Sequence, residues 1–84
     1  MSYEIFILRR AEKELRKISQ SNQQKIRKAI GNLSIEPKPT GCKKLKGRPA
    51  WRIRVGVYRI IYEISDRKLI ITVIDIGHRR DIYR

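Results

Sequence analysis

The sequence predicts an α+β domain in which an antiparallel sheet of about four strands carries an N-terminal helical hairpin on one face. Apolar residues alternate with polar ones near the start of the chain and over most of its second half, which is the period of a strand. Between residues 10 and 33 they recur every three or four positions, which is the period of a helix. The resulting order of strand, helix, helix, strand, strand, strand is typical of an α+β fold. With 84 residues in all, we expect residues 1–84 to form a single domain.

The first half of the chain supplies the expected first strand and both helices. Residues 3–8 (YEIFIL) form the strand, and a short amphipathic helix begins at Arg10. A break at residues 19–22 (SQSN) follows, in which Ser19 or Ser21 is a candidate N-cap for the second helix. The inward positions of the two helices are Ala11, Leu15, Ile18, Ile26, Ile30 and Leu33.

Pro37 and Pro39 end the second helix and open a connection over residues 36–49 that is rich in proline, glycine and lysine. Two strands follow, at residues 51–55 and 57–64, and Gly56 suits the first central position of a type II′ hairpin turn. The last strand, residues 68–77, is almost continuously apolar, so we expect it near the centre of the sheet.

The hairpin has one apolar face and one basic face. With Gly56 and Val57 in the turn, Arg54 faces Arg59 across the two strands, and the pair repels by about 0.5–1 kcal/mol in water. The core face then carries Trp51, Ile53, Val55, Tyr58, Ile60 and Tyr62, and the opposite face carries Arg52, Arg54 and Arg59. We expect this second face to be open. It is either a solvated surface with splayed arginines or a site for an anion.

The net charge of +13 favours a polyanionic or acidic partner. The single Cys42 allows no internal disulfide and fits a reducing cytoplasm, and the start of the chain shows no signal-peptide pattern. No apolar run is long enough to span a membrane. One histidine, one cysteine and eight scattered carboxylates offer no convergent metal ligands, so we expect neither metal nor cofactor.

Three stretches of the sequence resemble the RelE-type toxins of the RelE/ParE superfamily. They are AEKELRKI at 11–18, KKLKGRPAWRIRVGVYRIIYEI at 43–64 and IGHRRDIYR at 76–84. The resemblance implies a metal-independent mRNA interferase, an endoribonuclease that cuts the message in the A site of the 70S ribosome by attack of the 2′-hydroxyl. It also implies a cognate antitoxin that inactivates the toxin, with operator DNA contacted only through the complex, no membrane partner and a cytoplasmic location.

The resemblance also assigns roles to individual residues. Arg52 and Arg54 match positions, often lysine in the family, that contact the reacting phosphodiester or the 2′-hydroxyl. Arg59 matches the arginine expected to stabilise the transition state, and Arg79 one implicated in departure of the 5′-oxygen. Tyr83 matches a tyrosine that stacks on a base. Further contacts to RNA and the ribosome are expected from Lys43, Lys44, Lys46, Arg48, Arg80 and Arg84.

The general base is the weak point of this assignment. The neutral fraction of an arginine at pH 7 is about 10⁻⁵ or less, so arginine is a poor proton acceptor where a lysine would have served. His78 is the one side chain of the chain whose ordinary pKa lies near neutrality, and we hypothesise that it takes part in proton transfer. The alternative is that His78 bonds locally and shapes the end of the chain.

Two other functions are compatible with the sequence. One is a ParE-like toxin that poisons DNA gyrase without nuclease chemistry, and the other is a noncatalytic basic module that binds nucleic acid. The arginine cluster together with Tyr83 favours the interferase, because a gyrase poison needs no convergent phosphate site.

Overall fold

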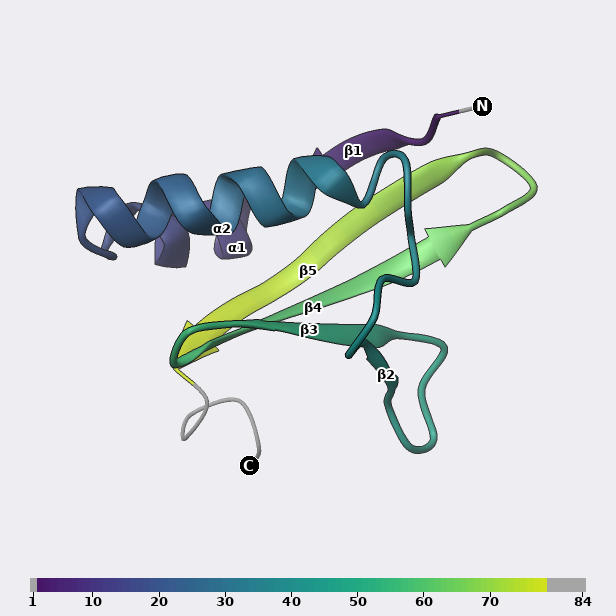
Figure 1. Cartoon of the computed structure of the whole chain (residues 1–84). Helices are drawn as coiled ribbons and strands as arrows, with labels where there is room; N and C mark the ends of the chain where they lie inside the picture. The colour runs from purple at the N-terminus through teal and green to yellow at the C-terminus, as the bar shows by residue number, and fades with distance from the viewer. Residues whose placement is uncertain (1, 79–84) are drawn as a thin grey trace.

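The computed structural model describes residues 2–78, and its helices lie together on one face of a twisted sheet (Figure 1). The sheet order is β1-β5-β4-β3-β2. The elements are β1 (Glu4–Ile7), α1 (Arg9–Arg16), α2 (Gln20–Asn32), β2 (Lys43–Lys44), β3 (Trp51–Val55), β4 (Tyr58–Ser65) and β5 (Ile70–His78). The predicted α+β class and the helical hairpin on one face are confirmed. No helix among the described residues is both long and apolar enough to cross a membrane.

The sheet differs from the expected one in two respects. It contains five strands within residues 2–78 and it is mixed, because β1 runs parallel to β5 while the other pairs are antiparallel. The additional strand, β2, is two exposed lysines inside the segment expected to be a loop, and it carries no apolar alternation that could have indicated it. The alternation of apolar and polar residues in β1 could not have predicted its parallel pairing either, because the same alternation is compatible with a parallel or an antiparallel neighbour.

The arginine hairpin has the predicted register. Arg54 pairs with Arg59 and Val55 with Tyr58, and Gly56 has a φ of +61°, the left-handed conformation that the turn requires. The strand β5 lies between β1 and β4, near the centre of the sheet as predicted. A β-bulge interrupts its pairing with β4, since Ile61 pairs with Asp75 but Tyr62 pairs with Val73.

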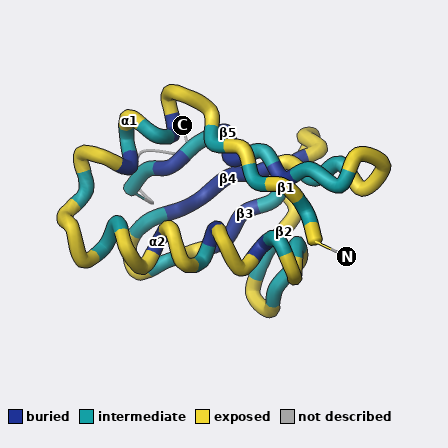
Figure 2. Tube along the Cα trace, turned by 90° about the horizontal axis from the view of Figure 1, so that it is seen from above, coloured by how far each residue is buried: buried dark blue, intermediate teal, exposed yellow. Residues whose placement is uncertain are grey.

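The main core lies between the helices and the sheet. Figure 2 shows buried residues along the middle strands and on the helix turns that face them. All six residues of the predicted core face of the hairpin belong to this core or pack against it. Its fully or nearly fully buried members from the helices are Ala11, Leu15, Ile26, Ile30 and Leu33.

An ion network ties the two helices together. The Glu12 carboxylate accepts hydrogen bonds from Arg16 Nε at 3.1 Å and from Arg27 Nη2 at 2.7 Å. The bond from Arg27, and after it the one from Arg16, keeps the pKa of Glu12 below its usual value against the opposing effect of partial burial. Ser19 is the N-cap of α2, as one of the two predicted serines, but its hydroxyl makes no capping bond.

Candidate functional site

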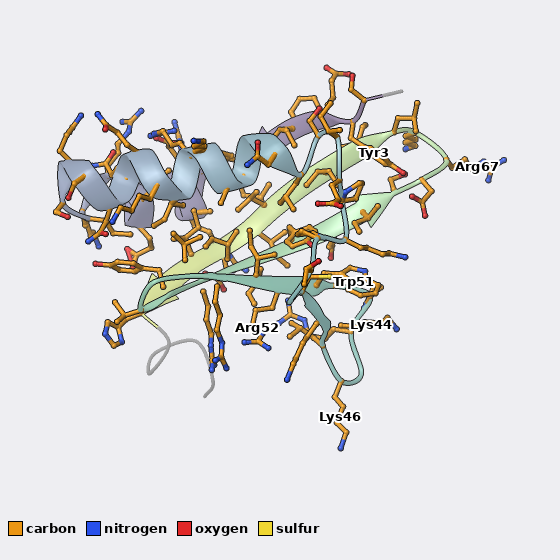
Figure 3. The ribbon with its side chains drawn as sticks, viewed as in Figure 1. Tyr3, Lys44, Lys46, Trp51, Arg52 and Arg67 are labelled. Atoms are coloured by element: carbon orange, nitrogen blue, oxygen red, sulfur yellow. The ribbon has the colours of Figure 1, made fainter. Side chains whose placement is uncertain are left out.

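The face of the sheet opposite the helices carries Arg52 and Arg54 from β3 and Arg59 from β4, and we call it the arginine face. Side chains of directly paired residues lie on the same face, so Arg54 and Arg59 leave the two strands next to each other on this face. Arg52 is two residues from Arg54 and therefore shares its face. Figure 3 shows Arg52 on the side of the sheet away from the helices. The three arginines thus share one face of the sheet, as the alternation predicted.

The expectation of an open face was wrong for two of these arginines. Arg52 is 4% exposed and Arg59 5%, whereas Arg54 is exposed. The reason is a second, smaller apolar cluster on the same side of the sheet. Its members are Ala50, Ile61 and Ile74, with Leu45 packed against them.

Two features of the backbone build this smaller cluster. The bulge in β5 adds Ile74 to the face that already carries Ile61, and Arg10 of α1 holds the bulge by donating from Nε to the Ile74 carbonyl at 2.9 Å. The segment that joins β2 to β3 turns back on itself through a bond from the Leu45 N–H to the Ala50 carbonyl at 2.9 Å. Sequence reasoning missed the cluster, because a bulge leaves no mark on the apolar pattern of β5.

Burial gives Arg52 an unusual electrostatic position. Its Nε and Nη1 atoms are buried, and neither has a hydrogen-bond partner among the described residues. A buried charged donor without a partner destabilises a fold by about 1–3 kcal/mol or more. Planar guanidinium groups match the oxygens of a phosphate, to which they can donate two bonds at once. The arginine face therefore carries the positive charge that a phosphate site requires, with Arg54 exposed and the Arg52 donors buried.

A rim of further cations borders the arginine face. Lys43 of β2 pairs with Arg52 and so lies on the same face, while Lys44 pairs with Trp51 and lies on the other. Lys46 projects from the tip of the β2–β3 connection, away from the sheet (Figure 3). These lysines and Arg48 are all exposed, as side chains that contact a phosphate backbone need to be.

The remaining candidate residues are not brought to the arginine face within the described part of the chain. His78 pairs with Tyr58, a residue of the core side, and their rings meet edge to face with centroids 6.2 Å apart. The register thus places His78 on the helix side at the end of β5. The other candidates, Arg79, Arg80, Tyr83 and Arg84, lie outside the described residues.

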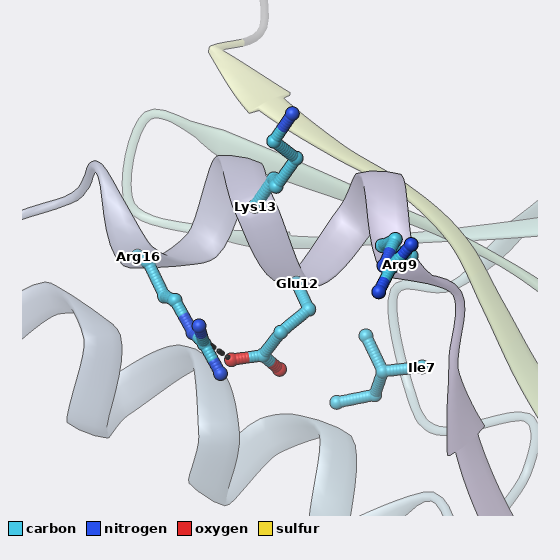
Figure 4. Close-up of a pocket in the computed structure, with 5 residues that line it drawn as sticks. All are labelled: Ile7, Arg9, Glu12, Lys13 and Arg16. Atoms are coloured by element: carbon cyan, nitrogen blue, oxygen red, sulfur yellow. Dashed lines mark hydrogen bonds and ion pairs between the residues drawn. The ribbon is translucent and has the colours of Figure 1, made fainter.

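A separate cleft of about 540 Å³ opens beside β1 and α1 (Figure 4). It is lined by Ile7, Arg9, Glu12, Lys13 and Arg16. Its one carboxylate, Glu12, is already bonded to Arg16 and Arg27, so the cleft is basic and offers no free proton acceptor. Within residues 2–78, no three histidine, cysteine or acidic residues are grouped as metal ligands.

The fold is shared with solved structures of RelE toxins. A free mutant form of Escherichia coli toxin RelE superposes with a TM-score of 0.82 at 27% identity, covering 98% of this chain and 88% of that one. The RelE–RelB toxin–antitoxin complex of E. coli gives 0.80 at 28% identity over 92% of this chain and 96% of the matched chain. In sequence, the mRNA interferase toxin RelE of E. coli is 29% identical over 82 residues, which are 94% of this chain and 85% of that protein.

A family model places the chain within this class. The model for the ParE toxin of type II toxin–antitoxin systems, parDE, matches residues 5–83. The chain therefore belongs to the RelE/ParE superfamily of type II toxin–antitoxin toxins, as a RelE-type member.

Proposed function

We propose that this toxin is an endoribonuclease that cuts mRNA in the ribosomal A site. The observation that carries the proposal is the Arg52 guanidinium, buried beside Arg54 and Arg59 with two nitrogens that lack partners among the described residues. The name of its E. coli relative, mRNA interferase toxin, supports the same activity.

The reaction is an internal displacement at phosphorus. The ribose 2′-oxygen bonds to the adjacent phosphorus, the bond from phosphorus to the 5′-oxygen breaks, and a 2′,3′-cyclic phosphate and a 5′-hydroxyl result. The proton leaves the 2′-hydroxyl and one is delivered to the departing 5′-oxygen. Negative charge builds up on the phosphate oxygens in between, and fixed donors aimed at that charge are commonly the largest contribution to catalysis.

The arginine face would supply these donors. The exposed Arg54 can meet the RNA backbone directly, whereas Arg52 and Arg59 are held by packing and would contribute their positive charge from beneath the surface. Each bond from a guanidinium to a phosphate contributes about 1.5–3 kcal/mol. Two such bonds contribute more free energy than the repulsion between Arg54 and Arg59 costs, so a phosphate bound here would offset that repulsion.

Proton transfer is assigned less directly. The position of His78 beside Tyr58, on the helix side, favours its alternative role of shaping the end of the chain over direct contact with the 2′-hydroxyl. Arg79 and Tyr83 keep the roles that the family resemblance implies, in departure of the 5′-oxygen and in base stacking.

Two partners follow from the proposal. The ribosome aligns the message, and the exposed lysines of the rim contact its RNA. A cognate antitoxin neutralises the toxin, as the RelE–RelB complex among its structural relatives suggests, and the charge of +13 favours an acidic inhibitor.

The deciding experiment is primer extension on a message bound to programmed ribosomes, with the wild type and the Arg59→Ala variant. We expect new 5′ ends within the A-site codon for the wild type and a loss of about 100-fold or more for the variant. An uncut message at saturating toxin would refute the proposal.

The ParE name of the matching family model keeps gyrase poisoning as a second candidate. Brief expression in cells separates the two. The interferase stops protein synthesis and leaves cut messages, whereas a poison induces the response to DNA damage while messages stay intact.

A further inference from the structure

The segment between α2 and β3 carries much of the basic rim, and we call residues 36–49 the basic loop. It contains Lys43, Lys44, Lys46 and Arg48. A segment of this length with only a two-residue strand would ordinarily be mobile. Figure 1 follows it from the end of α2 across the sheet edge to β2. A small number of contacts hold the basic loop in place over the sheet. One of them comes from a residue to which no role in binding or chemistry has been assigned.

That residue is Tyr62 of β4, whose side chain is fully buried on the helix side of the sheet. Its hydroxyl donates a hydrogen bond to the Pro37 carbonyl at 2.6 Å. Burial raises the pKa of the phenol well above its usual value, and the neighbouring Cys42 thiol raises it further. The hydroxyl therefore stays protonated at any physiological pH and remains a donor to the loop.

Further contacts hold the basic loop on either side of this hydrogen bond. The Cys42 N–H donates to the Pro39 carbonyl at 3.0 Å, and Lys38 Nζ lies 4.7 Å from the centroid of the Trp51 ring. Beyond β2, Leu45 is packed into the small apolar cluster of the arginine face. The loop is thus fastened on the helix side at its start and on the arginine side at its end, with the lysines of β2 between the two attachments.

We propose that Tyr62 is a positioning residue for RNA binding, acting through its hydroxyl bond to Pro37 to hold the basic loop beside the arginine face. The ligand of the loop is the phosphodiester backbone of RNA on the ribosome. The inference rests on the proposed function, because one of its tests measures mRNA cleavage. It goes beyond that function by assigning a role to a buried residue that does not contact RNA.

The physical reason is preorganisation. A loop that is already ordered loses less conformational freedom when its lysines meet phosphate, so binding is tighter. Arg52, Arg54 and Arg59 belong to β3 and β4, whose mutual pairing does not depend on Pro37. Loss of the Tyr62 hydroxyl should therefore weaken RNA binding while the chemical step in the bound complex continues unchanged.

The test compares Tyr62→Phe with Tyr3→Phe as a matched control. Both variants lose one phenol hydroxyl that donates a hydrogen bond, since the Tyr3 hydroxyl donates to Asp66 at 2.5 Å. The backbone of Tyr3 bonds to Ser34, just before the loop, but Tyr3→Phe leaves those bonds in place and removes only the bond to Asp66. Cleavage is measured against the concentration of programmed 70S ribosomes, and binding of each labelled toxin to the same ribosomes is measured by fluorescence anisotropy.

For Tyr62→Phe we expect KM and Kd to rise about 3- to 10-fold, which is the effect of one neutral hydrogen bond, with kcat within twofold of the wild type. Tyr3→Phe should leave all three constants unchanged.

Several results would overturn the inference. They are equal ribosome affinity of the wild type and Tyr62→Phe, no ribosome binding by the wild type, a fall in kcat with KM unchanged, or the same loss in Tyr3→Phe. If the wild type binds ribosomes but cuts no message, the proposed activity fails, while the binding constants of the two variants still decide the role of Tyr62.

Discussion

Replacing Arg52 by methionine should make the protein more stable and less active at the same time. Arg52 is 4% exposed, and its Nε and Nη1 are buried without hydrogen-bond partners among the described residues. Each unsatisfied nitrogen destabilises the fold by about 1 kcal/mol at the low end of the usual range, which amounts to about 2 kcal/mol for the pair. Methionine has a similar length and would pack against Ile61 and its apolar neighbours.

The expected gain of about 2 kcal/mol in unfolding free energy lies within the usual range for such changes. Replacing a buried charged group by a well-packed apolar side chain of similar volume stabilises a protein by up to about 4 kcal/mol. For a domain of this size, about 2 kcal/mol raises Tm by roughly 10 °C. The same change removes one charge-assisted contact to phosphate, about 1.5–3 kcal/mol, so cleavage should fall roughly 10- to 150-fold.

The assays are thermal and urea denaturation followed by circular dichroism, together with primer extension on programmed ribosomes. Arg54→Met is the matched control, because Arg54 lies on the same strand and face but is exposed. Because Arg54→Met also removes the repulsion with Arg59, its unfolding free energy should rise by about 0.5–1 kcal/mol, which is less than the rise expected for Arg52→Met. If Arg52→Met lowers stability, or changes it no more than Arg54→Met does, the reasoning from the unpartnered guanidinium is wrong.

Three further predictions concern the helices and the end of β5. Gly31→Ala should raise the unfolding free energy by about 0.5–1 kcal/mol in urea denaturation, because a Cβ at this exposed helix position meets no atom within 4 Å; a destabilised variant would contradict the described helix. Glu12→Gln should lower stability at pH 7 by about 0.5–1 kcal/mol. The pKa of the Glu12 carboxyl in the folded protein lies below its ordinary 4.5, so the stability difference between the variant and the wild type should be complete above pH 4.5. It should vanish as the pH falls through the folded pKa, and a constant difference down to pH 2 would refute the ion network. His78→Gln should leave the pH profile of cleavage unchanged, and a lost inflection near neutrality would show instead that His78 transfers a proton.

The hairpin was predictable in detail because local rules decide it. Gly56 selects the turn, the turn selects the register, and the alternation of residues 51–55 assigns each side chain to a face. The pairing of Arg54 with Arg59 and the core role of Tyr62 follow from these rules alone. The helical hairpin was predictable for the same reason, since the spacing of Leu15, Ile26 and other apolar residues defines the buried stripe of each helix.

The candidate site was only partly predictable, because burial on the arginine face depends on residues distant in sequence. Ile74 comes from a bulge that Arg10 of α1 stabilises, and Leu45 comes from the basic loop. Neither shows a signal that would direct it to Arg52. The bond from Tyr62 to Pro37 joins residues 25 positions apart and is likewise absent from any local pattern.

By itself the sequence determined the fold class, the two faces of the hairpin and the concentration of positive charge, because periodicity and composition act within a few residues of the chain. Only the tertiary structure decided which way β1 pairs, which arginines are buried and how the basic loop is fastened. The alternation of residues along a strand predicts which face each side chain occupies. Whether that face is buried depends on segments distant in sequence that pack against it.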